Sequence, residues 1–258
     1  MTYQELLVEH EAGIVTVALN RPDVRNVISD DPLMTELTEL CAVLDANLSV
    51  KVVIITGAGT AFSAGGNVAK MRNGEGMFAG PAAATALGYQ TGIQRLIRAV
   101  HSLRPVTIAS VNGPAMGAGF DLALACDLRI CATSAKFGET FVNLGLIPGD
   151  GGSWLLPRVV GYQRAAELSF TGRVIGADDA HRYGIVLAVH PDDELEAAAT
   201  ELARSIAAKP AFALRSAKQL LRRWTDEFSD VLDAAAPLQA LLHETAEHRA
   251  AVDAFGKR

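Results

Sequence analysis

The first part of the chain alternates between apolar and polar positions. Residues 6–20, LLVEHEAGIVTVALN, follow a period of two and carry Gly13 in the middle, which predicts a β-hairpin. Three mostly apolar runs come later, at 50–57, 106–113 and 127–133. Short apolar runs with glycine or polar ends predict strands that are buried on both faces.

Helical patterns lie between and after these runs. A helix is predicted from Asp31, with Asp31 as the N-cap and Pro32 in the first helical position. Residues 69–92 are rich in glycine and alanine with mixed charge, and we expect them to form a mobile loop. The segment 137–152 is expected to be a loop as well. Further helices are expected at the following ranges: 92–103, 120–126, 153–161, 166–172, 178–184, 194–208, 211–224 and a last one ending at 254.

The order of these elements indicates the fold class. The first two-thirds of the chain alternates strand, glycine-rich loop and helix, whereas the part from about residue 191 is helical. This order predicts an α/β layer architecture with a helical appendage.

Composition narrows the range of partners. The chain has 258 residues and a net charge of -6, which argues against a nucleic-acid partner. Its three cysteines form no CxxC pair, and its first residues contain no apolar signal segment, so we expect a reduced, cytoplasmic protein. The apolar stretch 105–126 is interrupted by Asn112, Pro114 and Asp121, so we expect no membrane span.

Two glycine-rich loops, AFSAGGN (61–67) and NGPAMGAG (112–119), each follow a predicted buried strand. One such loop alone predicts only a tight turn. Two on neighbouring strands can direct two backbone amides at a single oxygen atom, and the second loop also opens a helix whose dipole favours negative charge. Asp121 lies just inside that helix. The pair of loops therefore predicts an oxyanion hole.

Several motifs occur in a fixed order, and together they resemble one family. They are NRPDVRN (20–26), AFSAGGN (61–67), NGPAMGAGFDLALACDLRI (112–130), FGETFVNLGLIPGDGG (137–152) and LPRVVG (156–161). The chain resembles the enoyl-CoA hydratase/isomerase family, the crotonase superfamily, from the hairpin to its last residues. The resemblance implies an α/β crotonase-like spiral of β-β-α units in residues 1–190. It also implies a C-terminal helical trimerisation region in residues 191–258, and hence a homotrimer or a dimer of trimers.

The resemblance also implies the chemistry. Family members act on acyl-CoA thioesters through an enolate whose oxygen is held by two amides, here those of Gly66 and Ala118. The position of one hydratase glutamate is occupied by Asp121, which becomes the expected main acid/base. The position of the other is occupied by Phe141, which is expected to line the acyl pocket. Asp150 is the candidate second catalytic group, although helix capping is an alternative role for it.

Other acids, contacts and activities complete these expectations. Glu139, two residues before Phe141, is the other nearby acid that could replace the missing glutamate. The resemblance implies CoA contacts from the following residues: Arg25, Asn26, Ala64, Gly65, Asn67, Gly117, Phe255 and Lys257. We expect neither a metal nor a cofactor, because CoA belongs to the substrate. Hydration of a 2-enoyl-CoA is the expected reaction. A Δ3-Δ2-enoyl-CoA isomerase, a non-catalytic acyl-CoA binder and an assembly protein without CoA affinity are alternatives, and a thioester hydrolase or dehalogenase is less favoured.

HETAEH (243–248) lacks the spacing of a zinc helix, because Glu247 occupies the position of the second histidine. We expect it to form an exposed helix face.

Overall fold

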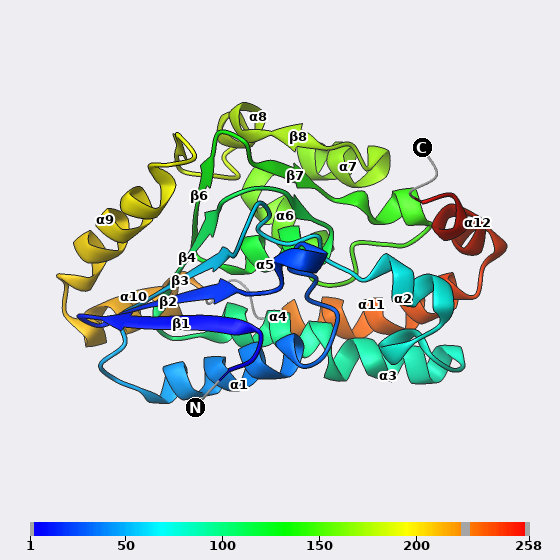
Figure 1. Cartoon of the computed structure of the whole chain (residues 1–258), viewed down its shortest axis with the longest axis horizontal. Coiled ribbons are helices and arrows are strands. Elements are labelled where there is room, and N and C mark those ends of the chain that lie inside the picture. Colours follow the sequence, from blue (N-terminus) through cyan, green and yellow to red (C-terminus); the bar gives the residue numbers. More distant parts are fainter. Residues whose placement is uncertain (1–2, 223–227, 256–258) are drawn as a thin grey trace.

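The computed structural model describes residues 3–222 and 228–255, apart from a few side chains in the C-terminal helices (Figure 1). The strands are β1 (Leu6–Glu11), β2 (Ile14–Leu19), β3 (Val52–Gly57), β4 (Val106–Val111), β5 (Ala115–Met116), β6 (Leu128–Ala132), β7 (Lys136–Gly138), β8 (Ile175–Gly176) and β9 (Val189–His190). The α-helices are α1 (Leu33–Ala46), α2 (Val68–Asn73), α3 (Ala82–Thr91), α4 (Ile93–Ser102), α5 (Ala118–Ala125), α6 (Gly152–Val160), α7 (Tyr162–Thr171), α8 (Ala177–Arg182), α9 (Leu195–Ala207), α10 (Ala211–Leu221), α11 (Phe228–His243) and α12 (Ala246–Ala254). Short 3-10 helices are η1 (Pro22–Val24), η2 (Gly76–Phe78) and η3 (Thr140–Leu144).

The main sheet has the strand order β1-β2-β3-β4-β6-β9. Strands β1 and β2 pair antiparallel, with Leu6 opposite Leu19, which confirms the predicted hairpin. Every later pair in this sheet is parallel. A small second sheet, β5-β7-β8, lies at the carboxyl side of the main strands and brings β5 next to β7. This mixed α/β arrangement agrees with the predicted fold class.

Alternate residues of the parallel strands face two different cores. Val52, Ile54 and Ile108 pack in a small cluster with α9, the helix along one face of the sheet (Figure 1). Val53 and Ile55 point the other way, into the large core beneath helices α1, α4 and α5. Both faces are therefore covered, which explains why these strands are apolar throughout.

The predicted mobile loop at 69–92 is wrong. Residues there form α2, η2 and α3. The segment AAATALGYQT contains the strongest helix former in several positions, and Tyr89 anchors α3 in the core. The glycines, which suggested a loop, are accommodated at helix ends and crossings. The predicted start of α1 also needs correction, since the helix begins at Leu33 with Pro32 as its N-cap.

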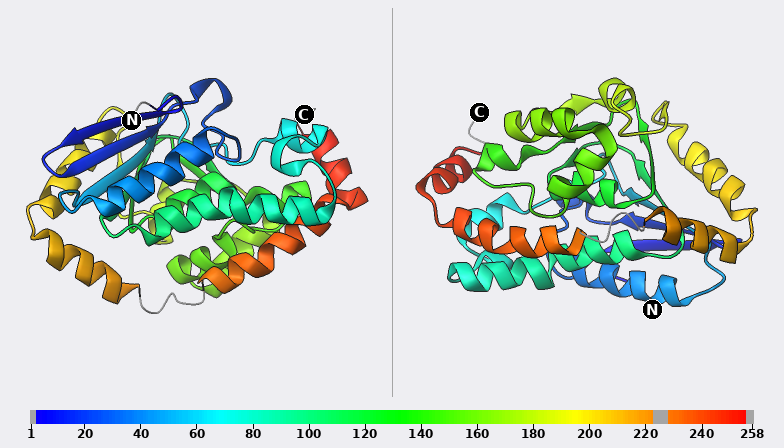
Figure 2. Two further views of the ribbon diagram at one scale, coloured as in Figure 1. Left: turned by 90° about the horizontal axis from the view of Figure 1, so that it is seen from below. Right: turned by 180° about the vertical axis from the view of Figure 1, so that it is seen from behind.

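The helical C-terminal region is confirmed by α9–α12. It is joined to the rest of the molecule, because Phe228, Leu232 and Ala236 of α11 belong to the large core. Helix α11 runs beside α3 in all three ribbon views (Figures 1 and 2). Among the described helices, none is both long enough and apolar enough to cross a bilayer. The three cysteines are buried, free thiols.

Candidate active site

The two glycine-rich loops meet, as predicted. Ser63 and Ala115 form a parallel bridge, and the Met116 amide donates to the carbonyl of Ser63 at 3.0 Å. Gly65 has φ +80°, and a Cβ there would lie 2.2 Å from the carbonyl oxygen of Met116 and 3.1 Å from the Ala118 nitrogen. Only glycine permits this approach, which places the backbone of one loop against the start of α5.

The amides of Gly66 and Ala118 are the two expected oxyanion donors. Both residues line the same cavity. Within the described ranges, neither amide donates to an acceptor of the chain. Ala118 is the first residue of α5, where an amide has no partner inside the helix and the dipole favours negative charge. Two free N–H groups on one cavity wall can bind a developing oxyanion.

The cavity has a volume of about 310 Å³ and is largely apolar. The ring of Phe141 forms part of the cavity wall, as expected from the sequence. Its edge is 3.5 Å from the position that a Cβ on Gly117 would occupy. The lining comprises Arg25, Ser29, Ala64, Gly66, Val68, Met71, Met77, Phe78, Tyr89, Ile93, Met116, Gly117, Ala118, Thr140, Phe141, Asn143, Leu144, Leu146, Asp150 and Phe255. This composition suits an apolar organic group next to a small polar centre.

Asp150 is the single carboxylate among the described lining residues. It precedes α6, but Gly151 is the N-cap residue and no side chain caps this helix, so the capping alternative is not observed. Two buried glutamines hold the loop. Gln94 Nε2 donates to the carbonyl of Gly149 at 2.9 Å, and Gln239 Oε1 accepts from the amide of Ile147 at 3.0 Å. We call Gln94 and Gln239 the glutamine clamp.

Asp121 and Glu139 lie together behind the cavity wall. A Cβ on Gly152 would be 2.4 Å from both Asp121 Oδ1 and Glu139 Oε1, so the two carboxyl groups flank the same glycine. Both side chains are buried and neither lines the cavity. Asp121, the expected main acid/base, therefore does not reach the cavity, whereas Asp150 is part of the cavity wall. Glu139, one of the two acids expected to be able to replace the missing glutamate, is paired with Asp121 through the turn from β7 into η3.

Burial sets the protonation of all three acids. Burial, and then the charge of Glu139, raises the pKa of Asp121. Burial raises the pKa of Glu139 to about 7, and the charge of Asp150 adds to this. Burial and then the charge of Asp121 raise the pKa of Asp150. Burial is the largest cause in each case, because a carboxylate is disfavoured in an apolar interior, whereas the hydrogen bond with Asp121 partly lowers the pKa of Glu139.

This burial predicts that Glu139→Gln stabilises the protein at high pH. A carboxyl whose folded pKa is raised binds its proton more tightly in the folded state, so stability falls as pH rises from about 4.5 to the folded value near 7. The variant loses that decline and should gain about 1–3 kcal/mol in free energy of unfolding at pH 8. Urea titrations at pH 4 and pH 8 measure the gain. Glu201→Gln on the exposed face of α9 is the matched control, and an equal gain at both pH values would contradict the explanation.

The other predicted contact residues fall into two groups. Arg25, Ala64, Gly117 and Phe255 line the cavity, whereas Gly65 does not. Asn26 does not, because its side chain accepts from the amide of Arg21 at 2.8 Å and donates to the carbonyls of Ala58 and Ala61. Asn26 therefore closes a backbone loop.

Asn67 likewise has a local role. Its Oδ1 caps α2 by accepting from the Lys70 amide, and its Nδ2 donates to Asp30. Lys257 lies outside the described residues.

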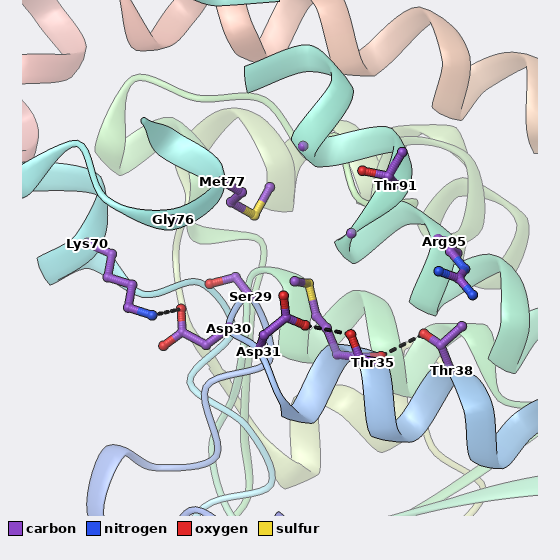
Figure 3. A pocket seen from close by; sticks show the side chains of 13 residues that line it. Ser29, Asp30, Asp31, Thr35, Thr38, Lys70, Gly76, Met77, Thr91 and Arg95 are labelled. Atoms are coloured by element: carbon purple, nitrogen blue, oxygen red, sulfur yellow. Dashed lines mark hydrogen bonds and ion pairs between the residues drawn. The ribbon is translucent and has the colours of Figure 1, made fainter. Parts of the chain in front are cut away.

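A second, more polar cavity of about 310 Å³ lies beside the first and shares Ser29 and Met77 with it (Figure 3). Its acidic groups already have partners. Lys70 Nζ is 3.2 Å from Asp30 Oδ1, and Thr35 donates to Asp31 at 2.7 Å. No group of three or more potential metal ligands is found in the described part of the chain.

Comparison with known proteins agrees with this geometry. A family model described as Enoyl-CoA hydratase/isomerase matches residues 9–258. The chain is similar to 1,2-epoxyphenylacetyl-CoA isomerase of Escherichia coli (strain K12), with 36% identity over 253 residues that cover 97% of this chain and 95% of that protein. It is also similar to crotonyl-CoA hydratase of Syntrophomonas wolfei, with 37% identity over 219 residues that cover 84% and 81% of the two chains.

A crystal structure of an enoyl-CoA hydratase/isomerase from Pseudoalteromonas atlantica T6c is similar over the whole fold. Its TM-score is 0.86 at 26% identity, and the match covers 98% of this chain and 97% of that one. The β-β-α spiral expected from the sequence is therefore confirmed.

Proposed function

Because the chain belongs to the enoyl-CoA hydratase/isomerase family, we propose that it processes an acyl-CoA by adding water to a 2-enoyl thioester. The single observation that carries this proposal is the pair of free amides, Gly66 and Ala118, on the wall of an apolar cavity that also exposes Asp150. No metal or cofactor is needed for this chemistry, and CoA enters as part of the substrate.

The reaction follows from the positions of these groups. The two amides bind the thioester oxygen and stabilise the negative charge that develops there when a nucleophile attacks the third acyl carbon. Ionised Asp150 accepts a proton from the attacking water and returns one to the second acyl carbon, which restores the thioester. A raised pKa brings Asp150 closer to the operating pH, and this helps a group that must both take and give a proton.

Double-bond isomerisation is the second candidate, and one observation favours it. Asp150 is the one carboxylate in the described lining, and moving a proton between two carbons needs only one acid/base. Phe141 at the position of a second glutamate fits the same reaction. Assays of the purified protein with 2-enoyl-CoA and 3-enoyl-CoA separate the two reactions. Water addition supports the first and double-bond migration the second, whereas binding of both esters without turnover would contradict both.

We expect kcat/KM to rise with pH through an apparent pKa well above that of an ordinary aspartate, about 3.9. The raised pKa of Asp150 has this consequence because only its ionised form accepts the proton of water. Asp121→Asn removes a nearby negative charge and should move the rise of kcat/KM to lower pH. Rates measured from pH 5 to pH 9 test both statements, and a profile that is flat down to pH 5 in the unmodified protein would exclude Asp150 as the base.

Family resemblance supports a homotrimer or a dimer of trimers in which the helical region 191–258 takes part. It also supports a cytoplasmic setting, together with the three free thiols. Sedimentation of the purified chain measures the assembly directly.

A further inference from the structure

Two histidines and a tyrosine form a continuous chain of hydrogen bonds beside the acyl cavity. The hydroxyl of Tyr89 is 2.8 Å from Nε2 of His243, whose Nδ1 is 2.9 Å from Nε2 of His248. Nδ1 of His248 is 2.5 Å from the carbonyl oxygen of Leu144. These histidines are the ends of HETAEH, for which the prediction of an exposed helix face is wrong.

The reason for the error lies in the local structure. Helix α11 ends at His243 and α12 begins at Ala246, so the motif spans a turn and not one helix. Thr245 caps α12 and turns His248 inward, where it is only 3% exposed. Two residues five positions apart, which would point in different directions on a continuous helix, are thus brought into contact.

The chain has a fixed direction when both imidazoles are neutral. A carbonyl oxygen only accepts, so Nδ1 of His248 carries the proton and its Nε2 accepts. Nδ1 of His243 must then donate, which leaves Nε2 of His243 as an acceptor. Burial, and then the charge of His248, lowers the pKa of His243 to about 4, so this ring is neutral near pH 7. The hydroxyl proton of Tyr89 is therefore directed at His243.

Tyr89 also belongs to the acyl cavity. Tyr89 is 2% exposed and lines the same cavity as Asp150. Phe78 packs against its ring edge at a centroid distance of 6.4 Å. Since the only hydroxyl proton is already donated to His243, the tyrosine oxygen offers lone pairs alone to a bound ligand.

We propose that Tyr89, oriented by His243 and His248, is a specificity-determining residue whose oxygen accepts a hydrogen bond from a hydroxyl group on the acyl chain. This rests on the proposed function, because it takes the occupant of the cavity to be an acyl-CoA. The geometry selects by polarity: a hydroxyacyl group donates to Tyr89, a saturated acyl group makes no such bond, and a ketoacyl group presents an oxygen that also only accepts. The preferred ligand class is therefore a hydroxyacyl-CoA whose hydroxyl group lies near Asp150. The product of hydration is one such ligand.

Calorimetric binding in an Asp150→Ala background, which blocks turnover, tests the proposal at pH 8, above the ordinary imidazole pKa. The probes are hexanoyl-CoA, 3-hydroxyhexanoyl-CoA and 3-oxohexanoyl-CoA. We expect the hydroxy ester to bind about fivefold more tightly than the saturated ester, which is the size of one neutral hydrogen bond, and the oxo ester to bind more weakly than the hydroxy ester. Tyr89→Phe should abolish the preference with little change in the affinity for hexanoyl-CoA.

His243→Leu supplies the test of orientation. It leaves the tyrosine in place but removes its acceptor, so the free hydroxyl can also donate to a keto oxygen. The preference for the hydroxy ester over the oxo ester should therefore be lost. Tyr183→Phe is the matched control, because Tyr183 lies outside the described lining and its hydroxyl bonds to Arg173, so the preference should remain. The proposal would be overturned if the preference over the saturated ester survived Tyr89→Phe, or if the preference over the oxo ester survived His243→Leu.

Three further outcomes are informative. If Tyr89→Phe lowers the hydration rate while the three esters bind equally, the tyrosine holds the attacking water and the proposed ligand contact is wrong. If none of the esters binds the unmodified protein, the acyl-CoA function itself has failed. Binding of the esters with no preference among them overturns only the role of Tyr89.

Discussion

Asp150→Asn should lower kcat by about 10²- to 10⁴-fold while the affinity for the acyl-CoA changes little. The expected size is that of one general acid/base. The substitution keeps the shape of the side chain and removes the group that we propose accepts and returns the proton. Because Asp150 is buried among apolar neighbours, replacing its carboxyl by an amide should not weaken the fold. Single-turnover rates with a saturating enoyl-CoA measure the effect.

The comparison with Asp121→Asn makes this result decisive. The two residues are both buried aspartates, but only Asp150 lines the described cavity. We expect Asp121→Asn to cost less than about tenfold in kcat, because its carboxyl acts on Asp150 through charge. A larger loss for Asp121→Asn than for Asp150→Asn would restore Asp121 to the role of main acid/base that the sequence suggested.

Ala118→Pro should reduce kcat/KM by about 10²- to 10³-fold, since it deletes one oxyanion donor. Proline has no amide proton, and the first position of a helix is where it is best tolerated. Ala118 occupies that position in α5, directly after the Gly117 N-cap. The substitution therefore removes an N–H group from the cavity wall with little demand on the helix. Initial rates with the acyl-CoA substrate, together with a melting curve, measure both effects.

Ala118→Ser is the control for this experiment. It retains the amide and adds one polar atom to the same wall, so its rate should stay within about tenfold of the unmodified protein. A protein with Ala118→Pro that melts normally and turns over at the original rate would show that the second amide does not hold the thioester oxygen.

The chain pattern predicts much of this fold because local and tertiary preferences agree. The hairpin, the three parallel strands and the meeting of the two glycine loops all follow from strand periodicity and from the steric freedom of glycine. The segment 69–92 differs from the prediction because the helix propensity of its alanines outweighs the flexibility of its glycines. Helix α3 becomes stable through its contact with α11, which is more than a hundred residues away.

The sequence predicts the part of the candidate site that consists of backbone amides better than the part that consists of side chains. Gly66 and Ala118 can be located from motifs, because their amides follow the path of the chain. The choice between Asp121 and Asp150 depends on which side chain reaches the cavity, and that is set by the packing of α5 against α6 around Gly152. The partnership of Tyr89 with His243 spans 154 positions and has no signal in the sequence.

The glutamine clamp ties the loop that carries Asp150 to two distant parts of the chain. Gln94 comes from α4 and Gln239 from α11, and together they fix the backbone on which Asp150 is carried. Cleavage between α10 and α11 would leave every strand of the main sheet covalently intact, yet it would cut the link between that sheet and one of the two supports. Such a nicked protein should remain compact while its turnover becomes dependent on whether the released helices stay docked.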